Sequence, residues 1–83
     1  EVVKRLSRIA SDEKDVALVR GIYDRVPREK IADDLGMSVD TLKKRLEKMY
    51  DKAFGWQNKL IRRKKANLFF EYLFTGTYEG MIR

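Results

Sequence analysis

The feature that most constrains the fold of this 83-residue chain is a run of apolar residues spaced three or four positions apart. The run consists of Val39, Leu42, Leu46, Met49 and Ala53. This spacing places all five side chains on one face of an α-helix. Ser38 precedes the run and is suited to cap its first turn, and Gly55 follows it and is suited to end the helix. The pattern therefore predicts an amphipathic helix that begins at residue 39.

A shorter apolar pattern lies just before that helix. Ile31, Ala32 and Leu35 predict a short helix over residues 28–35 that faces the core with these side chains. Pro27 is suited to its first turn. Gly36 follows where the backbone needs a left-handed angle to leave the helix. The two helices are thus joined by the short turn Gly36-Met37-Ser38.

The N-terminal third of the chain predicts two further helices. The first carries one apolar face over residues 2–10, and the second is expected from about Asp12 to Pro27, with Ser11 as its N-cap. Pro27 is expected to end the second helix because proline disfavours helical geometry in the preceding residue. The buried stripe expected on the second helix comprises Val16, Val19, Ile22, Tyr23 and Val26.

The C-terminal third predicts one long helix over residues 56–74, followed by a loop. Its apolar residues gather near the two ends, and a basic run lies between them at residues 62–65. The whole pattern predicts a single all-α domain over residues 1–83: a small helical bundle with a core over residues 11–54 and a C-terminal helical extension.

Composition narrows the classes of function. The chain has no cysteine and no histidine, so thiolate nucleophiles, imidazole bases and the usual transition-metal ligands are missing. Asp33 and Asp34 are adjacent, but neighbours on a helix point about 100° apart and do not converge on one ligand. We therefore expect no enzyme activity, no metal and no cofactor. Without a bilayer-spanning apolar run or a signal peptide, we expect a cytoplasmic protein with no membrane partner.

The spacing of the two central helices is typical of a helix-turn-helix. That motif needs a small residue where its helices cross, a glycine in the turn and apolar residues that lock the second helix onto the first. Ala32, Gly36 and Leu42 meet these needs, together with Val39 and Leu46. Residues 39–50 then form a recognition helix for the major groove of double-stranded DNA. The side chains predicted to contact base edges are Ser38, Asp40, Thr41, Lys44 and Lys48.

A second set of side chains is basic and suited to phosphates. The net charge of +6 and the pI near 9.7 fit a polyanionic partner. The predicted phosphate contacts are Arg28, Lys30, Lys43, Arg45, Arg62, Arg63, Lys64 and Lys65. For the run at 62–65, the alternative is a solvated helix face between two apolar patches.

The chain resembles a known family over residues 11–53, most closely over "REKIADDLGMSVDTLKKRLEKMYDKA". This region is similar to the C-terminal promoter-reading region of bacterial sigma factors and, more loosely, to LuxR-type regulators. The resemblance implies a compact helical domain that docks its recognition helix on a promoter and, as in sigma factors, contacts RNA polymerase. Residues 56–83 lie outside the resemblance.

Two alternatives remain open at this stage. The aromatic end of the last helix, with Phe69, Phe70, Tyr72 and Phe74, is expected to pack in the core or to form a homodimer contact, in preference to stacking on single-stranded bases. The acidic residues Asp33, Asp34, Asp40 and Asp51 near the reading surface favour a second class of function. In that class the chain is a protein-interaction module that binds RNA polymerase or another partner.

Overall fold

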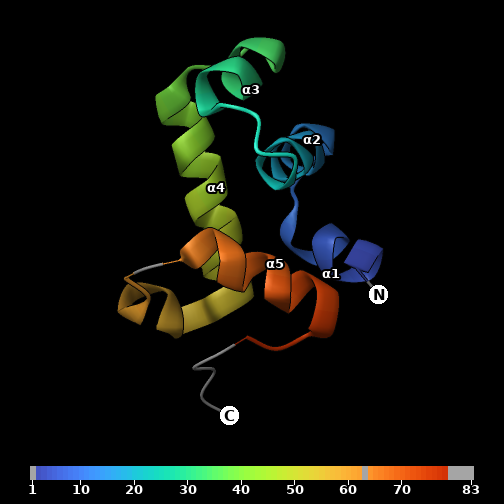
Figure 1. Ribbon diagram of the computed structural model, residues 1–83, viewed down its shortest axis with the longest axis vertical. Helices are drawn as coiled ribbons and strands as arrows, with labels where there is room; N and C mark the ends of the chain where they lie inside the picture. The colour runs from blue at the N-terminus through green and yellow to red at the C-terminus, as the bar shows by residue number, and fades with distance from the viewer. Residues whose placement is uncertain (1, 63, 79–83) are drawn as a thin grey trace.

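The computed structural model describes residues 2–62 and 64–78 of the chain (Figure 1). Its elements in chain order are α1 (Val2–Ile9), α2 (Glu13–Tyr23), α3 (Arg28–Asp34), α4 (Val39–Phe54), the 3-10 helix η1 (Gly55–Leu60) and α5 (Lys65–Thr75). The described residues form helices and no strand, which confirms the all-α class and the small bundle. Within these residues, no helix has the length and apolar character needed to cross a bilayer.

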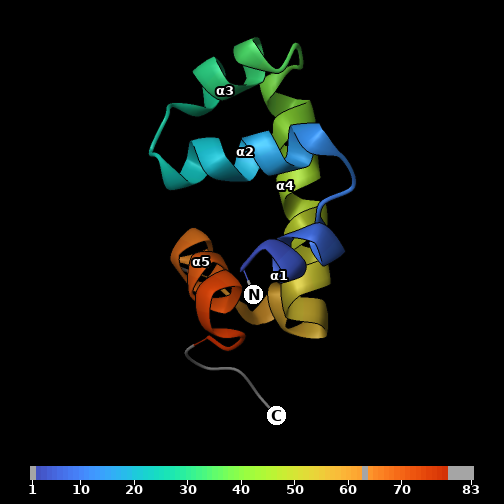
Figure 2. The ribbon, with the colours of Figure 1, turned by 90° about the vertical axis from the view of Figure 1, so that its right-hand side faces the viewer.

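Helix α4 is the central element of the bundle. It contacts each of the other five elements. Helix α3 packs at one end of α4, η1 follows at the other end, and α2 crosses beside the middle (Figures 1 and 2). Helices α1 and α5 contact each other near the η1 end, far from α3. The first half of α4 is therefore supported by α2 and α3, and the second half by α1, η1 and α5.

The turn between α3 and α4 forms as the sequence predicts. Gly36 has a φ of +68°, in the left-handed region, and its N–H donates to the Asp33 carbonyl at 3.1 Å. The Met37 N–H donates to the Ala32 carbonyl at 2.9 Å, which satisfies another carbonyl of the last turn. Ser38 Oγ accepts from the Thr41 N–H at 3.1 Å and so caps α4.

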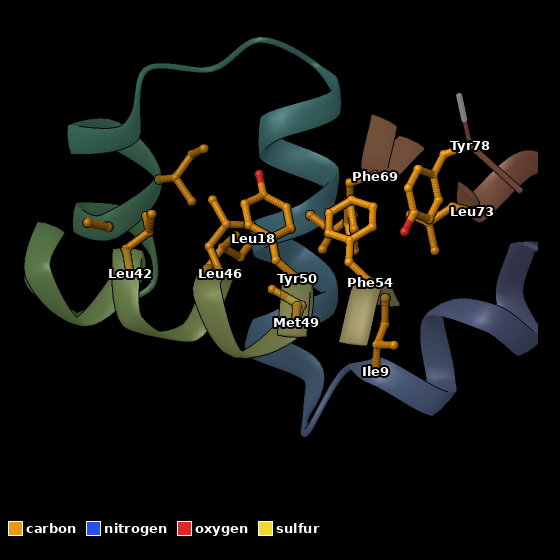
Figure 3. Packing of buried hydrophobic residues seen from close by; sticks show 13 residues of the cluster. Ile9, Leu18, Leu42, Leu46, Met49, Tyr50, Phe54, Phe69, Leu73 and Tyr78 are labelled. Carbon is orange, nitrogen blue, oxygen red and sulfur yellow. The ribbon is translucent and has the colours of Figure 1, made fainter. Parts of the chain in front are cut away.

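The predicted apolar face of α4 is largely buried. Leu42, Leu46 and Met49 are inaccessible to water, and Val39 and Ala53 are half-buried at the edges of the core. Around them lies one continuous cluster that draws residues from α1 to α5 (Figure 3). Since Ala32 and Ile31 of α3 belong to this cluster, α3 and α4 are held together by apolar burial.

Helix α2 differs from the prediction at both ends and in its buried face. Its N-cap is Asp12, whose Oδ1 accepts from the Asp15 N–H at 3.1 Å, and Ser11 lies outside the helix. The helix ends at Tyr23, before the expected end at Pro27. In between, Arg25 adopts a left-handed conformation and begins the link to α3.

The buried face of α2 is also rotated from the predicted stripe. Leu18 and Val19 are buried, whereas Val16 and Tyr23 remain 42% and 57% exposed. The helix carries apolar residues on two faces: Leu18 points into the core, and of the second face only Val19 is buried. The second face lines a shallow apolar groove with α1 and α5.

The prediction of a single C-terminal helix over residues 56–74 is wrong. The chain forms η1 and α5 as two separate helices, and Gly55 at the start of η1 and Lys64 before α5 have positive φ angles. This break lets α5 fold back so that the Phe69 ring packs against Tyr50, with centroids 5.1 Å apart. A continuous helix would have carried Phe69 away from α4, so aromatic burial opposes local helical continuity here.

Tyr78 extends the same aromatic cluster beyond the last helix. The segment after α5 was expected to be a loop, and residues 76–78 are not helical. Tyr78 is nevertheless buried, its ring centroid is 4.8 Å from that of Phe54, and its hydroxyl contacts Gln57 Oε1. Tyr78 thus takes part in the core although it lies after the last helix.

Candidate nucleic-acid interface

The five residues predicted to read bases lie on the surface of α4 and its N-cap, from Ser38 to Lys48. Ser38, Asp40, Thr41, Lys44 and Lys48 are all exposed. They lie outside the buried face that contains Leu42 and Leu46. Ser38 differs from the rest because its hydroxyl both caps the helix and contacts Thr41 Oγ1 at 3.0 Å. Its oxygen is therefore occupied within the protein, and the other four side chains make up the available surface.

A hollow separates this surface from the start of α2. Its lining residues, which define the α2 hollow, are Ser11, Asp12, Asp15, Thr41, Lys44, Arg45 and Lys48. Three predicted base contacts, Thr41, Lys44 and Lys48, thus form one wall. The opposite wall carries the carboxylates of Asp12 and Asp15. A ligand that enters this hollow meets lysines on one side and carboxylates on the other.

Arg45 has a different role from the predicted phosphate contact. Its Nη1 lies 3.1 Å from Asp12 Oδ1 and 3.1 Å from Asp15 Oδ1, so the guanidinium joins α4 to the first turn of α2. Asp15 is buried, and its Oδ2 also accepts from the Ser11 N–H at 2.8 Å. Because the carboxylates of α2 already engage this cation, the structure assigns Arg45 to the support of α4.

The ionisation of this cluster follows from its hydrogen bonds. The Asp15 backbone N–H lowers the pKa of the Asp12 carboxyl most strongly, and the Arg45 guanidinium lowers it further. The hydrogen bond to Asp15 raises the pKa of Arg45. Both shifts favour the charged forms, so the ion pairs are intact at neutral pH. Asp12 and Asp15 are partners of Arg45 that the helical periodicity does not indicate, although their three-residue spacing at a helix start is a recognisable capping pattern.

A second hollow lies on another side of α4. Its lining residues, which define the basic hollow, are Arg28, Lys43, Leu46, Glu47, Tyr50, Lys64, Lys65 and Ala66. Four of the predicted phosphate contacts, from the start of α3, from α4 and from the start of α5, meet here. Tyr50 lies among them as a buried residue, and burial raises the pKa of its phenol while the Arg28 charge lowers it. A buried aromatic ring and several cations therefore line the same hollow.

The other basic residues of the prediction lie outside both hollows. Lys30 is exposed on α3, with its Nζ 3.7 Å from Asp34 Oδ2. Arg62 is exposed between η1 and α5. Arg63 falls outside the residues that the structure describes. The basic run at 62–65 is thus not one face of a helix, since Arg62 and Lys64 precede α5 and Lys65 begins it.

Asn58 is a buried polar residue that the sequence analysis missed. Its Nδ2 donates to Glu47 Oε1 at 2.8 Å and to Asp51 Oδ1, and its Oδ1 has no partner within the described part of the chain. The interaction draws two acidic side chains of α4 toward η1. Nothing in the sequence pattern marks Asn58, because the segment reads as the first turn of a long helix.

Among residues 2–62 and 64–78, no three acidic side chains come close enough together to hold a metal ion. Comparison of the chain with protein families, with curated proteins and with solved structures finds no match. The likeness to sigma factors therefore stays a prediction from the residues.

Proposed function

We propose that this chain binds double-stranded DNA in a sequence-specific manner and acts in transcription in the cytoplasm, with α4 as its recognition helix. The observation that carries this proposal is the α3–turn–α4 unit. Ala32 and Leu42 are buried between the helices, while Thr41, Lys44 and Lys48 of α4 stay exposed. An α-helix with its side chains is about 10–12 Å across, and the major groove is about 12 Å wide. The exposed half of α4 is thus of a size to enter it.

The exposed side chains supply both donors and acceptors for base edges. Lys44 and Lys48 can donate to guanine O6 and N7, Asp40 can accept from the cytosine amino group, and Thr41 can do either. Ser38 contributes less because its hydroxyl is occupied in capping α4. Lys44 and Lys48 are therefore the residues that we expect to contribute most to sequence preference.

The remaining cations supply affinity that does not depend on sequence. Arg28, Lys30, Lys43, Arg62, Lys64 and Lys65 are the phosphate contacts in this proposal, and Arg63 stays a prediction outside the described residues. Each neutralised phosphate releases counterions and increases affinity at low salt. Arg45 is left out of this set because Asp12 and Asp15 engage it.

Two protein partners belong to the same proposal. The resemblance to sigma factors supports RNA polymerase as one partner. The other is a second copy of the chain, which would present two recognition helices to two half-sites. Tyr23 and Phe74 are exposed at a groove between α1, α2 and α5, and they are the side chains that we expect at such a contact. Sedimentation analysis of the free protein measures whether it is a dimer.

A protein-interaction module is the alternative function. The observation that favours it is the mixed charge of α4, where Asp40, Glu47 and Asp51 are exposed among the lysines. Carboxylates near the groove repel phosphates and weaken DNA binding. If this alternative holds, replacing Lys44 and Lys48 by alanine leaves DNA association unchanged, while an intact surface still binds a protein partner such as RNA polymerase.

Selection of bound duplexes from a random DNA pool, at near-physiological salt, tests the proposal. The wild type, Lys44→Ala and Lys4→Ala are compared, because Lys4 is exposed on α1, at the far end from α3, and its replacement changes the charge equally. We expect one enriched motif that Lys44→Ala weakens or shifts and Lys4→Ala preserves. No enrichment by a protein shown to be folded would reject sequence reading and favour the interaction module.

A further inference from the structure

The two hollows lie on opposite sides of α4. At 100° per residue, the α4 residues that line the α2 hollow point roughly 160° away from those that line the basic hollow. The side of α4 opposite the buried residues Leu42, Leu46 and Met49 lies between these two directions, and the reading surface extends from it to Thr41, Lys44 and Lys48 on the wall of the α2 hollow. When a helix lies in a major groove, the phosphate backbones of the two DNA strands pass along its two sides. Each hollow would thus face a different strand.

The charges of the two hollows are unequal. The α2 hollow has three cations and two carboxylates, and Arg45 is bound to both carboxylates. The basic hollow has four cations and only Glu47 as an acid. Glu47 is itself engaged, since its Oε1 accepts from Asn58 and lies 3.9 Å from Lys65 Nζ. An anion is therefore attracted much more strongly to the basic hollow.

Three cations of the basic hollow are available for a ligand. Arg28, Lys43 and Lys64 are exposed, and none of them lies within ion-pair distance of a carboxylate among the residues described. They come from the start of α3, from α4 and from the turn before α5. Three unpaired cations from three elements around one hollow form a site for phosphate oxygens.

Lys64 and Lys65 bring the start of α5 to this site. Lys64 adopts the left-handed conformation, with φ 56° and ψ 29°, and α5 begins at the next residue and lies across the η1 end of α4 (Figure 1). For a residue other than glycine, this conformation costs roughly 1–2 kcal/mol, so the surrounding structure must maintain it. The Lys65 Nζ lies 5.6 Å from the centre of the Tyr50 ring, and Phe69 packs on the same ring. These contacts hold Lys65, the residue after Lys64, beside α4.

We infer that the basic hollow binds the phosphodiester backbone of one DNA strand, and that the α2 hollow leaves the other strand without phosphate contacts. This inference rests on the proposed DNA binding and deepens it. Lys64 and Lys65 then belong to the DNA interface, together with the helix-turn-helix. Asp12 and Asp15 offset most of the positive charge on the side of the α2 hollow, and this asymmetry sets the orientation of the protein on its site.

The salt dependence of binding to a fluorescent random-sequence duplex tests the hollow without a known site. We compare Lys43→Gln and Lys64→Gln with Lys4→Gln, which removes the same charge from α1. Loss of one phosphate contact lowers the slope of log K against log salt by about 0.9. Between about 50 mM and about 200 mM salt, each hollow variant should then lose roughly 3.5-fold less affinity than the wild type. A slope for either variant that equals that of Lys4→Gln overturns the inference.

Phosphate neutralisation on the selected duplex tests the one-sided contact. Single methylphosphonates are placed along each strand in turn. We expect methylphosphonates to weaken binding of the wild type on one strand only. The same methylphosphonates should cause no further loss of affinity in Lys64→Gln, which has already lost the contact. Equal losses on both strands overturn the inference.

The outcomes separate this inference from the proposed function. If a motif is selected but the salt slopes of Lys43→Gln and Lys64→Gln are unchanged, DNA reading stays in place and phosphate binding by the basic hollow is rejected. If the salt slopes fall but no motif is selected, phosphate binding by the basic hollow is supported and sequence reading is rejected. If the folded protein binds no duplex at all, both are rejected.

Discussion

Replacement of Arg45 by methionine should weaken the fold while the proposed DNA contacts stay intact. Methionine keeps much of the side-chain length but removes every interaction with Asp12 and Asp15. The Asp15 carboxylate is only 3% exposed, and it would keep just the Ser11 N–H as a partner. An unpaired charge then stays buried beside α4, and the first turn of α2 loses its attachment.

The expected size of the effect follows from the geometry. Hydrogen bonds to charged groups contribute about 1.5–3 kcal/mol, and removal of one partner from a buried ion pair costs about 3–5 kcal/mol. The Arg45 side chain is 29% exposed, so water partly replaces it and the lower values apply. We expect a loss of about 2 kcal/mol in the free energy of unfolding. In a domain of this size, that lowers the Tm by roughly 8–16 °C.

Urea and thermal unfolding, followed by circular dichroism, measure this loss. A second variant that combines Arg45→Met with Asp15→Asn should be more stable than Arg45→Met alone, because it removes the unpaired charge. Lys44→Ala serves as the neighbouring control and should change stability by less than about 0.5 kcal/mol. The reasoning is refuted if Arg45→Met melts like the wild type and its salt slope for DNA falls by about 0.9, since Arg45 would then contact a phosphate.

Three further changes test other parts of the structure. Gly36→Ala should destabilise the protein by about 1 kcal/mol in urea unfolding, because its φ is +68° although space for a methyl group is open. A loss as large as a core truncation would show a steric clash there. Asp12 has a lowered pKa in the folded state, so its contribution to stability is present above about pH 4 and is lost as the pH falls through the folded pKa. Asp12→Asn keeps the cap and should flatten this part of the pH profile of unfolding; an unchanged profile would contradict the assignment. Burial raises the pKa of Tyr50, so above about pH 10 the unfolded state loses its proton first and stability falls as the pH rises. Tyr50→Phe should reduce this alkaline loss, and an equally steep loss in the variant would argue against a buried phenol.

Local patterns of the sequence predict the central part of the fold well. The turn at Gly36, the Ser38 cap and the buried face through Leu42 and Leu46 each depend on residues within one or two helical turns. Capping and periodicity are local properties, and here the tertiary contacts agree with them. The surface that follows from these elements, with Thr41, Lys44 and Lys48 exposed, was therefore predictable from the sequence.

The parts that differ depend on contacts between distant segments. The break before α5 exists because Phe69 and Tyr78 pack on Tyr50 and Phe54, and helical periodicity carries no information about that pairing. Arg45 looks like any basic residue on a helix until α2 is placed beside it. The basic hollow likewise appears only when α5 has folded back. Long-range packing thus decides the parts of the candidate site that sequence patterns leave open.

The aromatic cluster across α4 and α5 also bears on how this chain can be cut or grafted. Phe54 and Tyr50 are buried by rings that arrive from beyond residue 65. A fragment that stopped at the end of α4 would expose this end of the core to water and leave α4 without part of its support. The unit formed by α3, the turn and α4 is consequently not portable here, and a chimera that borrows its exposed surface must also carry α5 and Tyr78.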